Sequence, residues 1–184
     1  MAVLRDGGAL RATEEVGVSI RGIYQGYALQ QVDEKGRVAI PSSLRATLIA
    51  RSACNMDPKD AAQIVIAQHE SDTCLVGYDV PQREERFAAL EQRAKEHAGP
   101  DGAMNDQILR RGMAWDTLPF DSSGRFIFPT FPRKRAKIGR YAFFYGLGSH
   151  FEIWDPAQVL ASARADDTMR DMVLHFLDER GETL

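Results

Sequence analysis

The residues best suited to specific chemistry in this chain are two arginines, each placed just after a turn of the same type. Arg37 lies in the stretch 33–41 and Arg125 in the stretch 121–129, and both stretches follow the frame Asp-x-x-Gly-Arg-x-x-x-Pro. The four shared residues are 88 positions apart: 33 to 121, 36 to 124, 37 to 125 and 41 to 129. Coincidence at four positions, each a strong local determinant, indicates that the chain contains two related units.

An arginine in this position has two possible uses. Its planar guanidinium can bind the O6 and N7 of guanine, or a phosphate, through two hydrogen bonds. It can also pair with the aspartate of its own turn, Asp33 for Arg37 and Asp121 for Arg125, and so stiffen the turn without contacting a ligand. The two uses are compatible, because the aspartate would then orient the arginine. The duplication favours the first use, with Lys35 at the tip contacting a phosphate rather than a base.

The elements that must hold these arginines follow from the neighbouring residues. Residues 27–32 suit an extended strand, and the aspartate after them can start a tight turn through its side chain. Gly36 supplies a positive φ at little steric cost. The chain then resumes as a strand, which Pro41 ends because it has no N–H to donate. Ser42 or Ser43 can cap a short helix after it.

This hairpin, helix and turn-held arginine resemble the AbrB-type swapped-hairpin DNA-binding fold. The doubled frame in one chain resembles the MraZ family of bacterial transcriptional regulators. Three further stretches are similar to that family: Gln25-Gly26-Tyr27, Cys74-Leu75-Val76-Gly77-Tyr78 and Phe151-Glu152-Ile153-Trp154-Asp155. The resemblance covers roughly residues 22–159.

The resemblance implies a β-rich α/β fold in which two tandem AbrB-like units form one pseudo-dimeric, double-split β-barrel. It also implies a sequence-specific regulator that binds double-stranded DNA at direct repeats, in the promoter of a cell-division and cell-wall gene cluster. A ring-like homo-oligomer, a cytoplasmic and nucleoid-associated location, and the absence of a cofactor, membrane contact or enzymatic activity are further expectations. One alternative is an AbrB-type antitoxin-like module that binds DNA and a toxin. Another is an interaction scaffold, which would need both arginines to be buried in salt bridges.

Eight residues form the candidate DNA-contacting set: Asp33, Lys35, Arg37, Asp121, Arg125, Arg133, Lys134 and Arg135. The last three follow the second hairpin, where they can either bind phosphates or form only a solvated helix turn. Pro132 stands where the MraZ family usually continues with Leu-Arg. We expect it to shorten or shift the second helix, and so to change how Arg125 sits.

The two hairpins also differ in sequence. The second tip carries Ser122 and Ser123 and therefore lacks the cation that Lys35 gives the first. The bulky run 126–128 predicts an outgoing strand that is buried on both faces. We therefore expect the first hairpin to read sequence and the second to add affinity.

Charge is distributed unevenly along the chain. The net charge is −3 over 184 residues, which counts mildly against a nonspecific nucleic-acid binder. Residues 125–140, however, hold six basic residues and no acid, whereas acids gather in 84–96 and 166–182. This segregation predicts a basic face on an acidic body.

The remaining pattern predicts five regions. They are a loose extension (1–21), a first AbrB-like unit (22–80), a helical linker (81–117), a second AbrB-like unit (118–160) and a C-terminal helix (161–184). Each unit is too small to be stable alone, so we expect a shared core.

Residues 51–60 are expected to be a loop. Ile108, Leu109 and Met113 are expected to face inward from the second linker helix. Met169, Met172, Val173, Phe176 and Leu177 are expected to form the apolar face of the last helix.

Other kinds of site have little support in the sequence. The two cysteines, Cys54 and Cys74, lack metal-ligand spacing and suit a reducing compartment. The four histidines are scattered, and Gly146-Leu147-Gly148 lacks the Lys-Ser/Thr of a phosphate loop. We expect no signal peptide, and the sequence contains no run of about 20 apolar residues.

Overall fold

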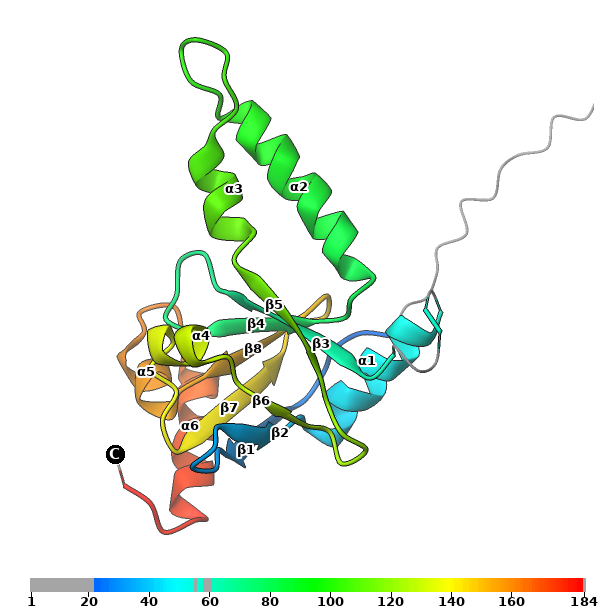
Figure 1. The fold of residues 1–184 in the computed structure, drawn as a ribbon. Coiled ribbons are helices and arrows are strands. Elements are labelled where there is room, and N and C mark those ends of the chain that lie inside the picture. The colour runs from blue at the N-terminus through cyan, green and yellow to red at the C-terminus, as the bar shows by residue number, and fades with distance from the viewer. Residues whose placement is uncertain (1–21, 55, 58–60, 184) are drawn as a thin grey trace, which may run out of the picture.

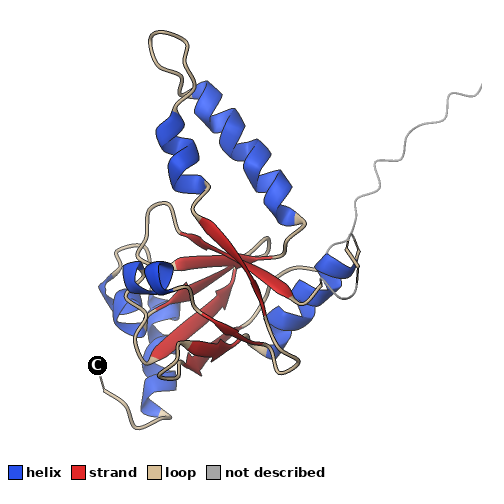
Figure 2. Cartoon of the chain, in the orientation of Figure 1, coloured by secondary structure: helices blue, strands red, loops and turns tan. Residues whose placement is uncertain are grey.

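The computed structural model describes residues 22–54, 56–57 and 61–183, so the expected extension 1–21 lies outside the described residues. The described residues contain eight strands and six helices. In chain order these are β1 (Tyr27–Gln31), β2 (Arg37–Ala39), α1 (Ser42–Ala53), β3 (Gln63–Gln68), β4 (Leu75–Tyr78), α2 (Gln82–Glu96), α3 (Asp106–Gly112), β5 (Trp115–Pro119), β6 (Arg125–Ile127), α4 (Thr130–Arg135), β7 (Tyr141–Gly146), β8 (Phe151–Trp154), α5 (Pro156–Ala161) and α6 (Asp167–Asp178). Figure 1 shows a central sheet with helices around it, and Figure 2 separates helices, strands and loops by colour.

The strands of the two repeats exchange partners. The main sheet is antiparallel throughout and has the order β1-β7-β8-β4-β3-β5. The first strand of repeat one, β1, therefore pairs with β7 of repeat two, and β5 of repeat two pairs with β3 of repeat one. A separate two-stranded ribbon joins β2 to β6. Because each repeat supplies strands to the other, neither can complete its own half of the sheet.

The larger core lies between the ribbon, α1 and one face of the main sheet. Val38 and Phe126 reach it from the ribbon and Leu44 and Leu48 from α1, and none of the four is more than 2% exposed. One continuous core thus serves both repeats, as expected for units too small to fold alone.

The C-terminal helix α6 covers the outer side of β1 and β7. Met169, Val173 and Leu177 are buried there against Leu29 and Phe143, while Met172 and Phe176 pack at the edge. The apolar face predicted from the helical spacing is therefore confirmed.

Helices α2 and α3 form an antiparallel pair that projects from the sheet (Figure 1). Leu90 and Ala94 of α2 are buried, but α3 has no buried residue and Met113 is 42% exposed. Ile108 and Leu109 are half-buried, because α3 packs mainly on α2 and less on β3, whereas the prediction that Met113 faces inward is wrong. Gly112 allows this close approach: a Cβ there would lie within 3.0 Å of Leu90 side-chain atoms.

Helix α1 also differs from the prediction. Pro41 occupies its N-cap position, and neither Ser42 nor Ser43 caps it through a side chain. The helix continues to Ala53, so the expectation of a loop from residue 51 is wrong for its first residues. A tertiary contact accounts for the longer helix, because Arg51 forms a buried ion pair with Asp79, 28 residues away.

Candidate nucleic-acid interface

The β2–β6 ribbon brings the two turn-held arginines onto one surface. Val38 pairs with Phe126 at its centre, and both side chains point into the core. Arg37 pairs with Ile127 and Arg125 with Ala39. Since side chains alternate across a strand, both arginines lie on the outer face, related by the pseudo-twofold symmetry of the repeats.

The same contacts hold the arginine in each turn. Asp33 accepts hydrogen bonds through Oδ1 from the backbone N–H of Lys35 at 2.9 Å and of Arg37 at 2.8 Å. Its Oδ2 accepts from Arg37 Nε at 2.6 Å. Asp121 repeats the pattern with the Ser123 amide and with the amide and Nε of Arg125, each at 2.9 Å.

These hydrogen bonds favour the ionised aspartates. The backbone amide of Arg37 is the largest influence that lowers the pKa of Asp33, followed by the Arg37 side chain. For Asp121, the amide of Arg125 likewise lowers the pKa most. Each turn thus carries a carboxylate that orients its arginine.

Both arginines remain accessible despite this pairing. The side chain of Arg37 is 50% exposed and that of Arg125 is 56% exposed. Each aspartate engages Nε, an arrangement that leaves the terminal amino groups outside the contact. The scaffold alternative required buried salt bridges at these positions, and the exposed side chains contradict that requirement.

Each hairpin tip is also held by the opposite repeat. Gly36 O accepts from Phe128 N at 3.0 Å, and Gly124 O accepts from Ile40 N at 2.9 Å. Both glycines have a positive φ, 79° and 78° respectively, in the left-handed region where a side chain is strained. The turns are therefore fixed from both sides of the ribbon.

Two further arginines pack across these tips, and sequence reasoning missed one of them. A Cβ on Gly36 would lie 3.0 Å from Arg133 Nη1, and a Cβ on Gly124 would lie 2.6 Å from Arg45 Cδ. Arg45 and Arg133 are themselves 88 positions apart. The same repeat offset that revealed the turns could thus have identified Arg45.

The basic cluster of the second repeat is divided by the structure. Arg133 is half-buried and donates from Nε to Ile138 O at 3.0 Å and from Nη2 to Gly139 O at 2.9 Å. Lys134 and Arg135 are exposed. Arg133 therefore closes the end of α4, while its two neighbours remain open to solvent.

The expectation that Pro132 changes how Arg125 sits is wrong. Helix α4 has 6 residues where α1 has 12, but it begins at the equivalent position, and Arg125 makes the same contacts as Arg37. Pro132 is tolerated because it lies in the first helical turn, where its missing N–H is not needed. The second outgoing strand is not buried on both faces either, since Ile127 is 58% exposed.

A groove of about 440 Å³ opens beside the first tip. Glu34, Lys35 and Gly36 line it from the first repeat, and the lining from the second repeat includes Ile127, Arg133 and Lys134. The structure thus brings Lys35 together with two of the three basic residues that follow the second hairpin. Arg135 is not part of this groove's lining.

Similarity to known proteins extends over most of the chain. No family model matches it. A protein named transcriptional regulator MraZ from Ruegeria sp. (strain TM1040) is 30% identical over 171 residues, which cover 86% of this chain and 96% of that protein. The chain belongs to the MraZ family. MraZ-named relatives from Bordetella pertussis (32% identical over 150 residues, covering 82% of this chain and 94% of that protein) and Pseudomonas aeruginosa strain LESB58 (29% over 163 residues, 83% and 100%) agree with this assignment.

Within the described part of the chain, no group of three or more histidine, cysteine or carboxylate side chains is placed to hold a metal ion. No helix in that same part is long and apolar enough to cross a bilayer.

Proposed function

We propose that this MraZ-family protein is a sequence-specific, DNA-binding transcriptional regulator that reads DNA with the outer face of the β2–β6 ribbon. The observation that carries the proposal is the pair of exposed arginines, Arg37 and Arg125, each oriented by the aspartate of its own turn. A two-stranded β-ribbon fits the major groove of B-DNA, and arginine is the usual partner of guanine there.

The spacing of the two arginines suits this groove. Arg37 and Arg125 are two residues apart along the ribbon register, which corresponds to about 7 Å at the usual rise of a strand. Two base-pair steps cover about the same length at roughly 3.4 Å each. Ile127 lies opposite Arg37 on the same face, two residues from Arg125 along β6, and can contact a thymine methyl group.

The phosphate contacts are proposed to come from the groove beside the first tip. Lys35 and Lys134 are exposed on its rim and can each neutralise a backbone phosphate. Arg135, exposed just after them, can extend this contact. Arg133 is proposed mainly to support the tip, because its guanidinium already donates to two carbonyls.

We propose further that the exchanged strands form the double-split barrel of two AbrB-like units. The pairings β1 with β7, β3 with β5 and β2 with β6 support this proposal, since each joins one repeat to the other. In a ring-like homo-oligomer, subunits arranged head to tail would present their ribbons in one direction and match direct repeats. The proposed target is a cell-division and cell-wall promoter, bound at the nucleoid in the cytoplasm. The names of the relatives give no support to the antitoxin alternative.

The test is binding of the full chain to DNA upstream of its own gene, against a scrambled sequence, by fluorescence anisotropy at one salt concentration. Loss of a bidentate base contact costs about 1–3 kcal/mol, so we expect Arg37→Ala to weaken operator binding by about 5- to 150-fold. Arg110→Ala is the matched control, because Arg110 is 77% exposed and also pairs with an aspartate four residues away, but on α3. Wild-type affinity in Arg37→Ala would refute the proposed interface.

The two hairpins are then compared with the same two DNAs. We expect Arg37→Ala to remove the preference for operator over scrambled DNA, and Arg125→Ala to weaken both DNAs by similar factors. The reason is the unequal surroundings, since Lys35 stands at the first tip and Ser123 at the second. Equal loss of discrimination in both variants would show instead that the two arginines read bases alike.

A further inference from the structure

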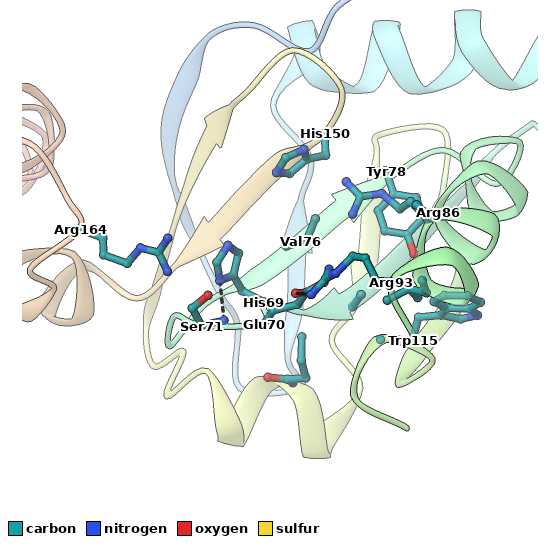
Figure 3. A pocket seen from close by; sticks show the side chains of 15 residues that line it. His69, Glu70, Ser71, Val76, Tyr78, Arg86, Arg93, Trp115, His150 and Arg164 are labelled. Atoms are coloured by element: carbon teal, nitrogen blue, oxygen red, sulfur yellow. Dashed lines mark hydrogen bonds and ion pairs between the residues drawn. The ribbon is translucent and has the colours of Figure 1, made fainter. Parts of the chain in front are cut away.

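A cavity of about 370 Å³ is lined by residues of the main sheet and of the α2–α3 pair, and by none of the two hairpin turns (Figure 3). Its volume is that of a small-molecule site. Val76, Leu90 and Trp115 give it an apolar wall. The polar residues discussed next come from several elements and face the same space.

Arg86 is the unusual residue of this cavity. Its guanidinium lies over the Tyr78 ring, 4.3 Å from the ring centre. Its Nε is buried and has no hydrogen-bond partner among the described residues. Burial is the largest influence on this group and lowers its pKa. A buried donor without a partner costs free energy, so its retention requires an explanation.

The two carboxylates that interact electrostatically with Arg86, those of Glu70 and Asp79, are each paired with another arginine. Arg93 donates from both terminal nitrogens to Glu70, each at 2.8 Å, and that carboxylate is therefore already paired. Arg164 adds a third guanidinium, with Asp72 at 3.5 Å. Figure 3 shows Arg164 on one side of the cavity and the two arginines of α2 on the other.

His150 also lies near positively charged groups of this cavity. Burial first, and then the neighbouring charges of Arg86 and His69, lower the pKa of His150 to about 4. His150 and His69 both line the cavity and point between the arginines (Figure 3). Three arginines and two histidines thus line the cavity beside a single carboxylate, that of Glu70, and a phosphate has three terminal oxygens that can accept from such groups.

We propose that this cavity binds a small phosphate ester, whose phosphate is held by Arg86 and whose compact organic part packs on Trp115 and Val76. Arginine suits this ligand because its fork matches phosphate oxygens. Because Arg86 Nε has almost no accessible surface, the ligand would reach the terminal nitrogens of the guanidinium. This site is separate from the ribbon and does not depend on DNA binding.

The first experiment is calorimetric titration of the full chain in a phosphate-free buffer with three probes. Phenyl phosphate carries both parts of the proposed ligand, inorganic phosphate carries only the anion, and benzyl alcohol carries only the aromatic ring. We expect phenyl phosphate to bind tightest, phosphate more weakly, and benzyl alcohol not detectably. Absence of phenyl phosphate binding, or equal binding of benzyl alcohol, would overturn the proposal.

The second experiment identifies the residue. Arg86→Gln should weaken phenyl phosphate about tenfold to a hundredfold, the usual effect of losing a charge-assisted hydrogen bond. Arg110→Gln removes the same charge from α3 outside the cavity lining and should leave the affinity unchanged. Arg86→Lys should recover part of the binding. Equal affinity in Arg86→Gln and wild type would refute the role of Arg86.

Two further measurements cover a variant that does not fold and an assembly of several copies. If Arg86→Gln does not fold by circular dichroism, Ala89→Phe replaces it, since Ala89 is exposed and lines the cavity. The larger side chain should fill the space and abolish binding, and unchanged binding would overturn the proposal. Light scattering during the titration tests whether a second copy of the chain occupies the cavity. Dissociation of an assembly by phenyl phosphate would show that a carboxylate of the second copy binds there, and this result would also overturn the proposal.

Discussion

The buried ion pair between Arg51 and Asp79 gives a stability prediction that can be worked out from the structure. Arg51 Nε lies 2.5 Å from Asp79 Oδ2, with the side chains 7% and 0% exposed. Asp79 also accepts from the Tyr24 hydroxyl at 3.0 Å and from the backbone N–H of Gln82 at 3.1 Å. Arg51 Nη1 donates to Gly22 O at 3.0 Å. The pair therefore joins α1 to the start of α2 and to the chain before β1.

Replacing Arg51 with methionine keeps much of the volume but leaves the Asp79 carboxylate buried without its cation. Breaking such a pair from one side costs about 3–5 kcal/mol. We expect the lower end, about 3 kcal/mol, because two donors to the carboxylate remain. For a chain of this size that loss lowers the melting temperature by about 6–12 °C. The Arg51→Met, Asp79→Asn double variant should lose less than the sum of the two single variants.

The assay is urea unfolding followed by circular dichroism, at one protein concentration because assembly would change apparent stability. Arg93→Met is the matched control. Arg93 forms an ion pair of similar length with Glu70, at 2.8 Å, but those side chains are 47% and 49% exposed. Solvent screening should limit its loss to about 0–1 kcal/mol. A loss below about 1 kcal/mol in Arg51→Met, or equal losses in both variants, would refute the reasoning from burial.

Three other predictions concern pH, the second tip and salt. Burial, and then the charge of Arg86, lower the pKa of His150 to about 4, so the folded state favours the neutral ring. The stability that this group contributes is therefore present above its ordinary pKa of 6.5 and is lost as the pH falls from 6.5 to about 4. The melting temperature of His150→Gln should vary less with pH in that window than that of the wild type, and parallel profiles would contradict this. Gly124→Ala should cost the roughly 1–2 kcal/mol of a positive φ and little more, because the Arg45 atoms that its Cβ would meet belong to the end of a flexible side chain. Its loss should match that of Gly102→Ala, since nothing lies within 4 Å of that Cβ, and a clearly larger loss for Gly124→Ala by urea unfolding would show that Arg45 is held at the tip. Operator affinity should fall by orders of magnitude between about 50 and 200 mM salt, and a flat response would argue against a phosphate-dominated interface.

The features that sequence predicted best are those set by neighbouring residues. The Asp-x-x-Gly-Arg frame fixes a turn, and each turn has its aspartate on the arginine as expected. The spacing of Met169, Val173 and Leu177 also predicted which face of α6 is buried. In both cases the determining contacts lie within one turn or one helix, so a short window of sequence contains them.

Features that depend on distant partners were missed. The extension of α1 through Arg51 depends on Asp79, which lies on another element. Strand β5 (115–119) was not assigned, and its first residues fall within the range 81–117 expected to be the helical linker. This strand lies at the edge of the sheet and is only partly buried, so it lacks a strong apolar alternation. Its pairing with β3, about 50 residues earlier, is what defines it.

The repeat comparison indicates where the two hairpins differ. The turns themselves are alike, since Asp33 and Asp121 make the same three contacts. The difference lies in the arginine behind each tip. Arg133 supports the Gly36 tip while fixed by two carbonyls of its own repeat, whereas Arg45 reaches the Gly124 tip from a helix twice as long as α4.

This difference bears on which hairpin can discriminate between bases. A base contact discriminates only when its side chain is held in one geometry, because a mobile guanidinium can adapt to several hydrogen-bond patterns. The first tip combines a cation, Lys35, with a support that is itself fixed by Ile138 and Gly139. The second has neither of these features, although its arginine is paired in the same way. We therefore expect two nearly equal turns to read bases unequally because their supports differ. Pro132 lies in the shorter supporting helix and leaves Arg125 with the contacts of Arg37, which is compatible with this expectation.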